Sequence, residues 1–155
     1  MRRMALFSSL LATCGILSAS ICPAAAWDLV TRGEVKREHT AHHNKAAPAS
    51  AGHGAPIITV ERPNLRDRLV PPLTLHITFR PQGGATIEPK TFRATYGSLG
   101  IDITRHIVAH ARLTSSGLLA NNASIPAGSY RVTLRIADNR HRVGARTFQF
   151  TVHRR

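Results

Sequence analysis

Apolar and polar residues alternate along much of the chain after Pro56. Residues 73–80 read Leu-Thr-Leu-His-Ile-Thr-Phe-Arg, and residues 130–136 place Tyr, Val, Leu and Ile on one side with Arg, Thr and Arg on the other. Successive side chains of a β-strand point to opposite faces, so this period of two predicts strands with one buried face. Shorter runs of the same pattern predict further strands at 92–96 and 147–152, and the short apolar segments at 57–60 and 118–120 are predicted to be strands as well.

Residues 102–114 fit two patterns. Asp102 could cap a single helical turn that places Ile103 and Ile107 on one side. Residues 109–114 instead alternate as a strand would. We predict a short turn of helix followed by a strand.

Turn residues separate the predicted strands: Pro-Gln-Gly-Gly at 81–84, Pro-Ala-Gly at 126–128 and Asp-Asn-Arg-His at 138–141. About seven short strands, each with one apolar face, must bury those faces against one another. We therefore predict an all-β domain over residues 56–155, an immunoglobulin-like antiparallel β-sandwich.

Residues 1–26 have the features of a secretory signal peptide. Arg2 and Arg3 precede an apolar run, and Ala24 and Ala26 fit the small-residue pattern before a cleavage site. Cleavage after Ala26 would leave Trp27 as the first residue of a periplasmic or secreted bacterial protein. A retained anchor is the alternative, but the run is short and rich in Ser and Ala, whereas a spanning helix needs about 20 strongly apolar residues.

Both cysteines of the chain, Cys14 and Cys22, lie within the predicted signal peptide. They follow Thr13 and Ile21, which does not match a lipoprotein signal. The exported part is therefore expected to have no disulfide, no thiolate metal site and no cysteine nucleophile. It is not expected to be an integral membrane protein.

Residues 27–55 are predicted to be a disordered linker that is basic and contains histidine. The segment is charged at 32–38 and rich in Ala, Pro, Ser and Gly at 46–54. It offers few large apolar side chains to offset the entropy of ordering its backbone. The single tryptophan, Trp27, is thereby placed outside the domain.

The chain is strongly basic, with 21 Lys and Arg against 8 Asp and Glu, a formal net charge of +13. Residues 56–155 hold 15 of the basic and five of the acidic residues, a net charge of +10. The planar fork of arginine binds carboxylate and phosphate bidentately, so arginines on one strand face could bind a polyanion. Arginines dispersed over solvated strand faces are the alternative. The candidates on the predicted strands are Arg93, Arg112, Arg131, Arg135 and Arg146.

Two family resemblances add to this interpretation. Tyr96-Gly97 with 100–104, and Ile-Pro-Ala-Gly-Ser-Tyr at 125–130 running into 131–138 and 148–152, resemble a bacterial immunoglobulin-like domain. This resemblance covers about residues 56–153 and implies a sandwich fold, which hosts adhesion, structural and binding roles alike. The closing pattern also resembles copper-resistance proteins of the CopC type.

The CopC-type resemblance implies a Cu(II) site made from an Asp-x-His in the last hairpin and a histidine at the mature N-terminus. Here Asp138 and His141 are three positions apart, and the expected N-terminus is Trp27. Neutral imidazoles suit Cu(II), Ni(II) or Zn(II), although a solvated tail and ordinary turn chemistry explain the same residues. The candidate metal ligands are His39, His42, His43, His53, Asp138 and His141.

No catalytic constellation is predicted, because no two of the five carboxylates at 56–155 have a spacing that pairs them, and the sequence has no nucleophile-elbow motif and no phosphate-binding glycine loop. We expect a non-enzymatic exported module with a basic surface and no cofactor or small-molecule substrate. Its partner would be a protein or an anionic envelope component. The alternative is a periplasmic copper- or metal-binding protein.

Overall fold

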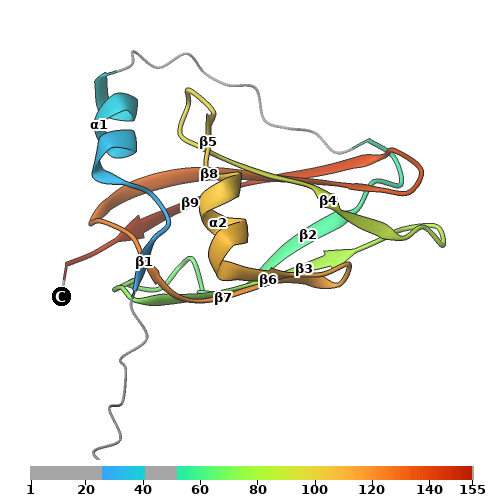
Figure 1. The fold of residues 1–155 in the computed structure, drawn as a ribbon, viewed down its shortest axis with the longest axis horizontal. Helices are drawn as coiled ribbons and strands as arrows, with labels where there is room; N and C mark the ends of the chain where they lie inside the picture. Colours follow the sequence, from blue (N-terminus) through green and yellow to red (C-terminus); the bar gives the residue numbers. More distant parts are fainter. Residues whose placement is uncertain (1–25, 41–51, 155) are drawn as a thin grey trace, which may run out of the picture.

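The chain forms two facing layers of β-structure, described by a computed structural model over residues 26–40 and 52–154 (Figure 1). Residues 1–25, 41–51 and 155 lie outside this described part. The predicted signal peptide, apart from Ala26, and the middle of the predicted linker therefore fall outside it.

The first sheet is organised around an antiparallel pair in which Ile77 lies opposite Leu118. The second strand of this pair is β7 (Gly117–Ser124), and two short strands pair with its other edge, one after the other. One of these is antiparallel and the other parallel to it. In pairing order the strands are β1 (Trp27–Asp28), β7 (Gly117–Ser124), β3 (Leu73–Arg80) and β2 (Ile57–Arg62), with β6 (Ala111–Leu113) also on β7.

The second sheet contains the longest strands. Its final hairpin pairs without interruption from Gly128 opposite Val152 to Ala137 opposite Val143. All of its pairings are antiparallel. In pairing order the strands are β5 (Ile101–Asp102), β4 (Ile87–Tyr96), β8 (Gly128–Asp138) and β9 (Val143–Val152).

The core lies between the two sheets and is filled by the alternating apolar residues. Phe79 of β3 and Phe92 of β4 bring their ring centroids to 6.0 Å across this interface. The Tyr130 ring stacks on Phe150 at 5.6 Å and contacts Tyr96 in a tilted arrangement at 5.5 Å. The predicted fold class, an all-β sandwich, is confirmed by this arrangement of buried faces.

The strands are longer than their alternation predicted, most clearly in β4, which begins at Ile87 rather than Phe92. Pro89 interrupts the apolar pattern there, and proline cannot donate to a sheet hydrogen bond. The register between β4 and β8 is irregular between Glu88 and Arg93, and β5 pairs only with Thr95 and Tyr96. Pro89 is therefore accommodated in a stretch of β4 where the ladder is incomplete.

Helix α2 (Thr104–His110) connects the two sheets and confirms the prediction of a helical turn followed by a strand. Ile103 and Ile107 are both buried, at 0% and 3% exposure. The N-cap residue is Ile103 rather than the predicted Asp102, although the Asp102 carboxylate accepts a hydrogen bond of 2.8 Å from the backbone N–H of Thr104. These contacts orient the helix with its apolar side on the core.

The start of the predicted linker differs from expectation. Trp27 is 9% exposed, and Leu29 and Val30 are buried with it in the core, so the ordered unit includes residues that the sequence assigned to a disordered segment. The residues that Trp27 contacts are distant in sequence. The Trp27 Nε1 donates a hydrogen bond to the Asn121 carbonyl at 2.8 Å, and the Trp27 ring stacks on His110 at 4.8 Å. Burial of these side chains offsets the entropy of ordering the segment.

Helix α1 (Arg32–Thr40) follows at once and begins with a capping box. The Thr31 hydroxyl and backbone N–H both donate to Glu34 Oε2, at 2.9 and 2.8 Å. The Glu34 N–H in turn donates to the Thr31 hydroxyl at 3.3 Å. This Thr-x-x-Glu spacing is a helix-start signal that the sequence interpretation missed among the neighbouring charges. In the described part of the chain, neither helix is long and apolar enough to cross a membrane.

Candidate anion-binding face

Three of the five candidate arginines lie on one face of the second sheet. Arg131 and Arg135 are exposed on β8, where they alternate with buried residues such as Val132 and Leu134. Arg93 of β4 lies directly opposite Arg135. Directly opposed residues of an antiparallel pair point to the same side, so all three arginines face outward, away from the core.

The other two candidates lie elsewhere. Arg146 of β9 is opposite the buried Leu134, so it occupies the inner side of the sheet edge, with its guanidinium carbon 5.8 Å from the Phe148 ring centroid. Arg112 lies on β6 in the first sheet, opposite the exposed Leu119. The predicted set therefore divides into three residues that share a face and two that do not.

A row of hydroxyl groups separates Arg131 from the other two arginines. Thr95 lies opposite Thr133, and Thr133 lies opposite Thr147. The Oγ1 atoms of Thr133 and Thr147 are 2.9 Å apart, within hydrogen-bond distance. We call the six residues together the arginine face: Arg93, Arg131, Arg135, Thr95, Thr133 and Thr147.

One carboxylate borders the arginine face: Asp102 of β5 lies directly opposite Thr95, and the charge of Arg93 helps to lower its pKa, but among the described residues no ion pair joins it to an arginine of the face. Among the described residues, the ion pair is that of Arg142 with Asp138, and His106 lies 3.9 Å from the Glu34 carboxylate, so neither contact includes an arginine of this face. Arg93 donates instead to the backbone carbonyl of Phe92 at 2.7 Å. Like charges directly opposite one another destabilise a sheet, so a bound anion would relieve the repulsion between Arg93 and Arg135.

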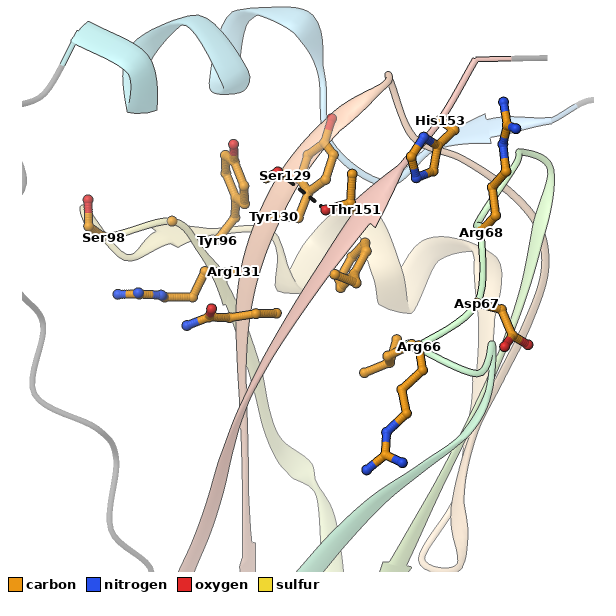
Figure 2. A pocket seen from close by; sticks show the side chains of 14 residues that line it. Arg66, Asp67, Arg68, Tyr96, Ser98, Ser129, Tyr130, Arg131, Thr151 and His153 are labelled. Carbon is orange, nitrogen blue, oxygen red and sulfur yellow. Dashed lines mark hydrogen bonds between the residues drawn. The ribbon is translucent and has the colours of Figure 1, made fainter.

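A depression of about 1020 Å³ adjoins the arginine face at Arg131, and we call it the first depression. Figure 2 shows Arg131 on one side of it and Arg66, Arg68 and His153 on the other. Its floor includes the Ser129 hydroxyl, which lies 3.3 Å from that of Thr151. The full lining is Leu65, Arg66, Asp67, Arg68, Tyr96, Gly97, Ser98, Ser129, Tyr130, Arg131, Gln149, Phe150, Thr151 and His153.

Arg66, Arg68 and His153 were not among the predicted site residues. The loop that carries the two arginines is fixed beside the end of β9, because the His153 N–H donates to the Leu69 carbonyl at 2.8 Å and Leu69 forms a bridge with Val152. This contact joins residues more than 80 positions apart, and no local pattern encodes it. Asp67 is the acidic residue of the lining, and it accepts a hydrogen bond from the Asn64 amide at 2.9 Å.

A second depression, of about 880 Å³, adjoins the arginine face at Arg93. Lys90, Arg105 and His106 add basic groups to it, and Asp102 is its acidic residue. Hydrogen bonds from Thr104 lower the pKa of Asp102 most strongly, and the charges of Arg93 and Arg105 lower it further. Asp102 therefore stays ionised over a wide pH range and leaves the surrounding arginines in excess.

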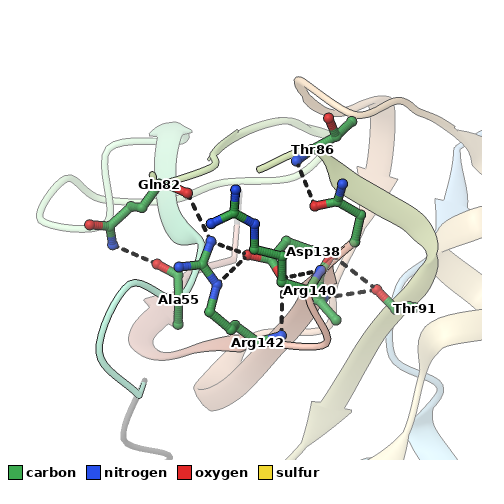
Figure 3. Close-up of polar contacts among 9 residues, drawn as sticks. Ala55, Gln82, Thr86, Thr91, Asp138, Arg140 and Arg142 are labelled. Atoms are coloured by element: carbon green, nitrogen blue, oxygen red, sulfur yellow. Dashed lines mark hydrogen bonds and ion pairs between the residues drawn. The ribbon is translucent and has the colours of Figure 1, made fainter. Parts of the chain in front are cut away.

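Asp138, a candidate metal ligand, is buried within a hydrogen-bonded hairpin (Figure 3). Its Oδ1 accepts from the backbone N–H groups of Arg140 and Arg142, at 2.9 and 3.0 Å, and its Oδ2 accepts from the Arg142 guanidinium at 2.8 Å. Burial acts to raise the pKa of Asp138, but the hydrogen bonds from Arg142 and Arg140 together lower it. The carboxylate is therefore engaged in closing the hairpin, which is the turn chemistry considered as an alternative.

The candidate histidines are dispersed. His141 is exposed in the hairpin loop at a φ of 58°, and His53 is exposed before β2. His39 lies in α1, whereas His42 and His43 fall outside the described residues. Within residues 26–40 and 52–154, no group of three or more His, Cys, Asp or Glu is arranged to hold a metal ion.

The chain is similar to solved protein structures, of which CopC is one. The crystal structure of CopC from Methylosinus trichosporium OB3b is similar over 56% of this chain and 84% of its own. The sequence identity is 19% and the TM-score 0.38. No family model matches the chain, and neither does any curated protein sequence.

Proposed function

We propose that this chain is an exported, non-enzymatic binding module that holds a polyanion on its arginine face. The observation that carries the proposal is the directly opposed pair Arg93 and Arg135, with Arg131 on the same face and no carboxylate in ion-pair distance among the described residues. A ligand bearing phosphate or carboxylate would neutralise these charges through bidentate hydrogen bonds.

The site, rather than the fold, supports this function, since β-sandwiches carry many unrelated activities. The two depressions extend the basic surface beyond the arginine face, with Arg66 and Arg68 at one end and Lys90 and Arg105 at the other. A periplasmic or extracellular location would expose this surface to anionic envelope components. The surrounding field would also accelerate encounter with such partners.

Metal binding through the last hairpin receives less support. Both carboxylate oxygens of Asp138 accept hydrogen bonds from Arg140 and Arg142. Coordination of a cation there would displace the Arg142 guanidinium and leave it beside a second positive charge. We therefore propose anion binding in preference to the copper-binding alternative.

Two variants with equal loss of charge test the proposal. The first replaces Arg93, Arg131 and Arg135 by Gln. The second replaces Arg62, Arg80 and Arg112, which are exposed on the first sheet, by Gln. Each variant removes three positive charges, so net charge cannot explain a difference between them.

Retention on immobilised heparin in a salt gradient is the measurement. We expect the first variant to elute at clearly lower salt than the second, and the slope of log affinity against log salt to fall by about 3. Equal losses in the two variants would show that the arginine face is not the site. Wild-type retention that does not respond to salt would contradict an electrostatic mechanism.

A further inference from the structure

The arginine face is continuous with both depressions, which makes an extended basic track rather than a point site. Arg131 belongs to the arginine face and to the lining of the first depression. Arg93 belongs to the arginine face and to the lining of the second. A ligand that follows the track therefore passes from Arg66 and Arg68 along the outer face of β8 to Lys90 and Arg105.

The length of this track excludes a small anion as its full occupant. Arg131 and Arg135 are four residues apart on β8, which corresponds to about 13 Å of strand. A single phosphate or a single acidic sugar could contact either Arg131 or the Arg93–Arg135 pair. It could not reach both of these and the two depressions beyond them. The geometry calls for a chain with charges at intervals.

The groups between the arginines are neutral hydrogen-bonding groups that both donate and accept. The Thr133 and Thr147 hydroxyls pair at 2.9 Å, and the Ser129 and Thr151 hydroxyls at 3.3 Å. Gln149 lies opposite Arg131 and adds an amide. Hydroxyl and amide side chains complement the hydroxyls of sugars, which also donate and accept.

Other polyanions fit the track less well. Single-stranded nucleic acids bind through base stacking on exposed aromatic rings, but the rings that line the first depression pack on the core: Tyr96 and Tyr130 are 2% and 3% exposed, and the partly buried Phe150 stacks on Tyr130. Stable protein interfaces centre on buried apolar residues, whereas the middle of the track consists of arginines and threonines beside Asp102, and apolar side chains such as Val108 and Phe150 line only the depressions at its ends. Neither of these partner classes matches alternating cations and hydroxyls.

Resting on the proposed function, we propose that the ligand is a linear polysaccharide with carboxylates, lying along β8 between the two depressions. The three arginines of the arginine face bind its carboxylates. The threonine row, which consists of Thr95, Thr133 and Thr147, binds its hydroxyls. Recognition then depends on chain length and on sugar hydroxyls as well as on charge.

The experiment is calorimetric titration of the protein with galacturonate, with polygalacturonate oligomers of increasing length, and with single-stranded DNA and polyphosphate of matched charge. We expect affinity to rise with oligomer length until the track is filled and to exceed the affinity for DNA and polyphosphate. Fully methyl-esterified oligomers, which keep the hydroxyls but lose the charges, should not bind.

A charge-neutral variant isolates the hydroxyl contribution. Replacing Thr133 and Thr147 together by Val removes the hydroxyl pair without orphaning a partner. Replacing Thr59 and Thr74 of the first sheet by Val provides the control. Loss of one or two hydrogen bonds should weaken oligomer binding about fivefold or more in the first variant and leave the control unchanged. Circular dichroism confirms that both variants fold.

The outcomes separate this inference from the proposed function. If DNA or polyphosphate binds as tightly as the oligomers, or if oligomers bind no better than galacturonate, the polysaccharide inference is overturned while polyanion binding stands. If the Thr133 and Thr147 variant binds oligomers like the wild type, the threonine row has no role in recognition and the inference is also overturned. If no polyanion binds, both proposals are wrong.

Discussion

Asp138 and Arg142 form a buried carboxylate–guanidinium pair, 2.8 Å apart, that closes the turn between β8 and β9. The same guanidinium donates to the Gln82 carbonyl at 2.8 Å, so the pair also fastens the hairpin to the loop after β3. Asp138 is 0% exposed. Its charge is therefore stabilised by these donors and not by water.

Replacing Arg142 by Met should destabilise the domain, because the buried carboxylate would lose its charged partner. Arg140, which contributes only its backbone N–H to Asp138, is the matched control in the same hairpin. We expect the urea midpoint of Arg142→Met to fall several times further than that of Arg140→Met. Equal midpoints would mean that the backbone donors alone stabilise the carboxylate.

Lowering the pH should remove the stabilisation that the Asp138–Arg142 pair provides. The pKa of Asp138 is lowered from its ordinary value of 3.8, so the unfolded state binds a proton more readily than the native state. Its contribution to stability is present above pH 3.8 and is lost as the pH falls through the native pKa. Urea unfolding between about pH 5 and pH 2 should show this decline, and Asp138→Asn should flatten it.

Asp102 also contributes to the loss of stability at low pH, since its pKa is lowered as well. Asp102→Asn measured in parallel separates the two contributions. An Asp138→Asn protein whose stability declines with acid as steeply as that of the wild type would show that the Arg142 pair is not linked to pH.

Local alternation was sufficient to predict the sandwich because each sheet buries one face, and a period of two encodes that burial directly. Residues 130–136 show this most clearly: every second side chain is buried in β8. The arginine face follows from the same alternation as far as Arg131 and Arg135 are concerned. That Arg93 lies opposite Arg135 depends on strand pairing, which alternation does not specify.

The rest of the site and the N-terminal segment depend on contacts between residues far apart in sequence. Arg66 and His153 line the same depression because Leu69 forms a bridge with Val152. Trp27 is ordered because its backbone pairs with the edge of β7 and its side chain stacks on the His110 ring. The sequence signal available nearby was the capping box of Thr31 and Glu34, which predicts that ordered structure begins before residue 56.

Trp27 should contribute to stability although it lies in the segment expected to be disordered. It is 9% exposed, and it combines core packing, a ring stack and a hydrogen bond to Asn121. Truncation to Ala should cost about 3 kcal/mol, at the lower end for a large aromatic residue because the segment can detach. Urea unfolding followed by circular dichroism measures this loss.

Trp27→Phe is the control, since it keeps a six-membered aromatic ring but removes the pyrrole part of the indole with its N–H. It should lose about 1 kcal/mol, the net value of one hydrogen bond. Because Trp27 is the single tryptophan, its fluorescence in the wild type reports docking directly. Free access of a soluble quencher to Trp27 in the folded protein would contradict the ordered N-terminal segment.

The Arg93–Arg135 pair should show opposite effects on stability and on binding. Replacing Arg135 by Glu converts a repulsive cross-strand pair into an attractive one, which should stabilise the domain by roughly 0.2–1 kcal/mol. The same change places a negative charge in the middle of the arginine face and should weaken heparin binding about tenfold at low salt. Arg112→Glu in the first sheet changes the net charge equally but leaves the pair intact, so it should reduce binding far less and give no gain in stability. If Arg135→Glu instead lowers stability and leaves heparin binding unchanged, Arg93 and Arg135 do not repel one another across the strands and do not act as a binding pair.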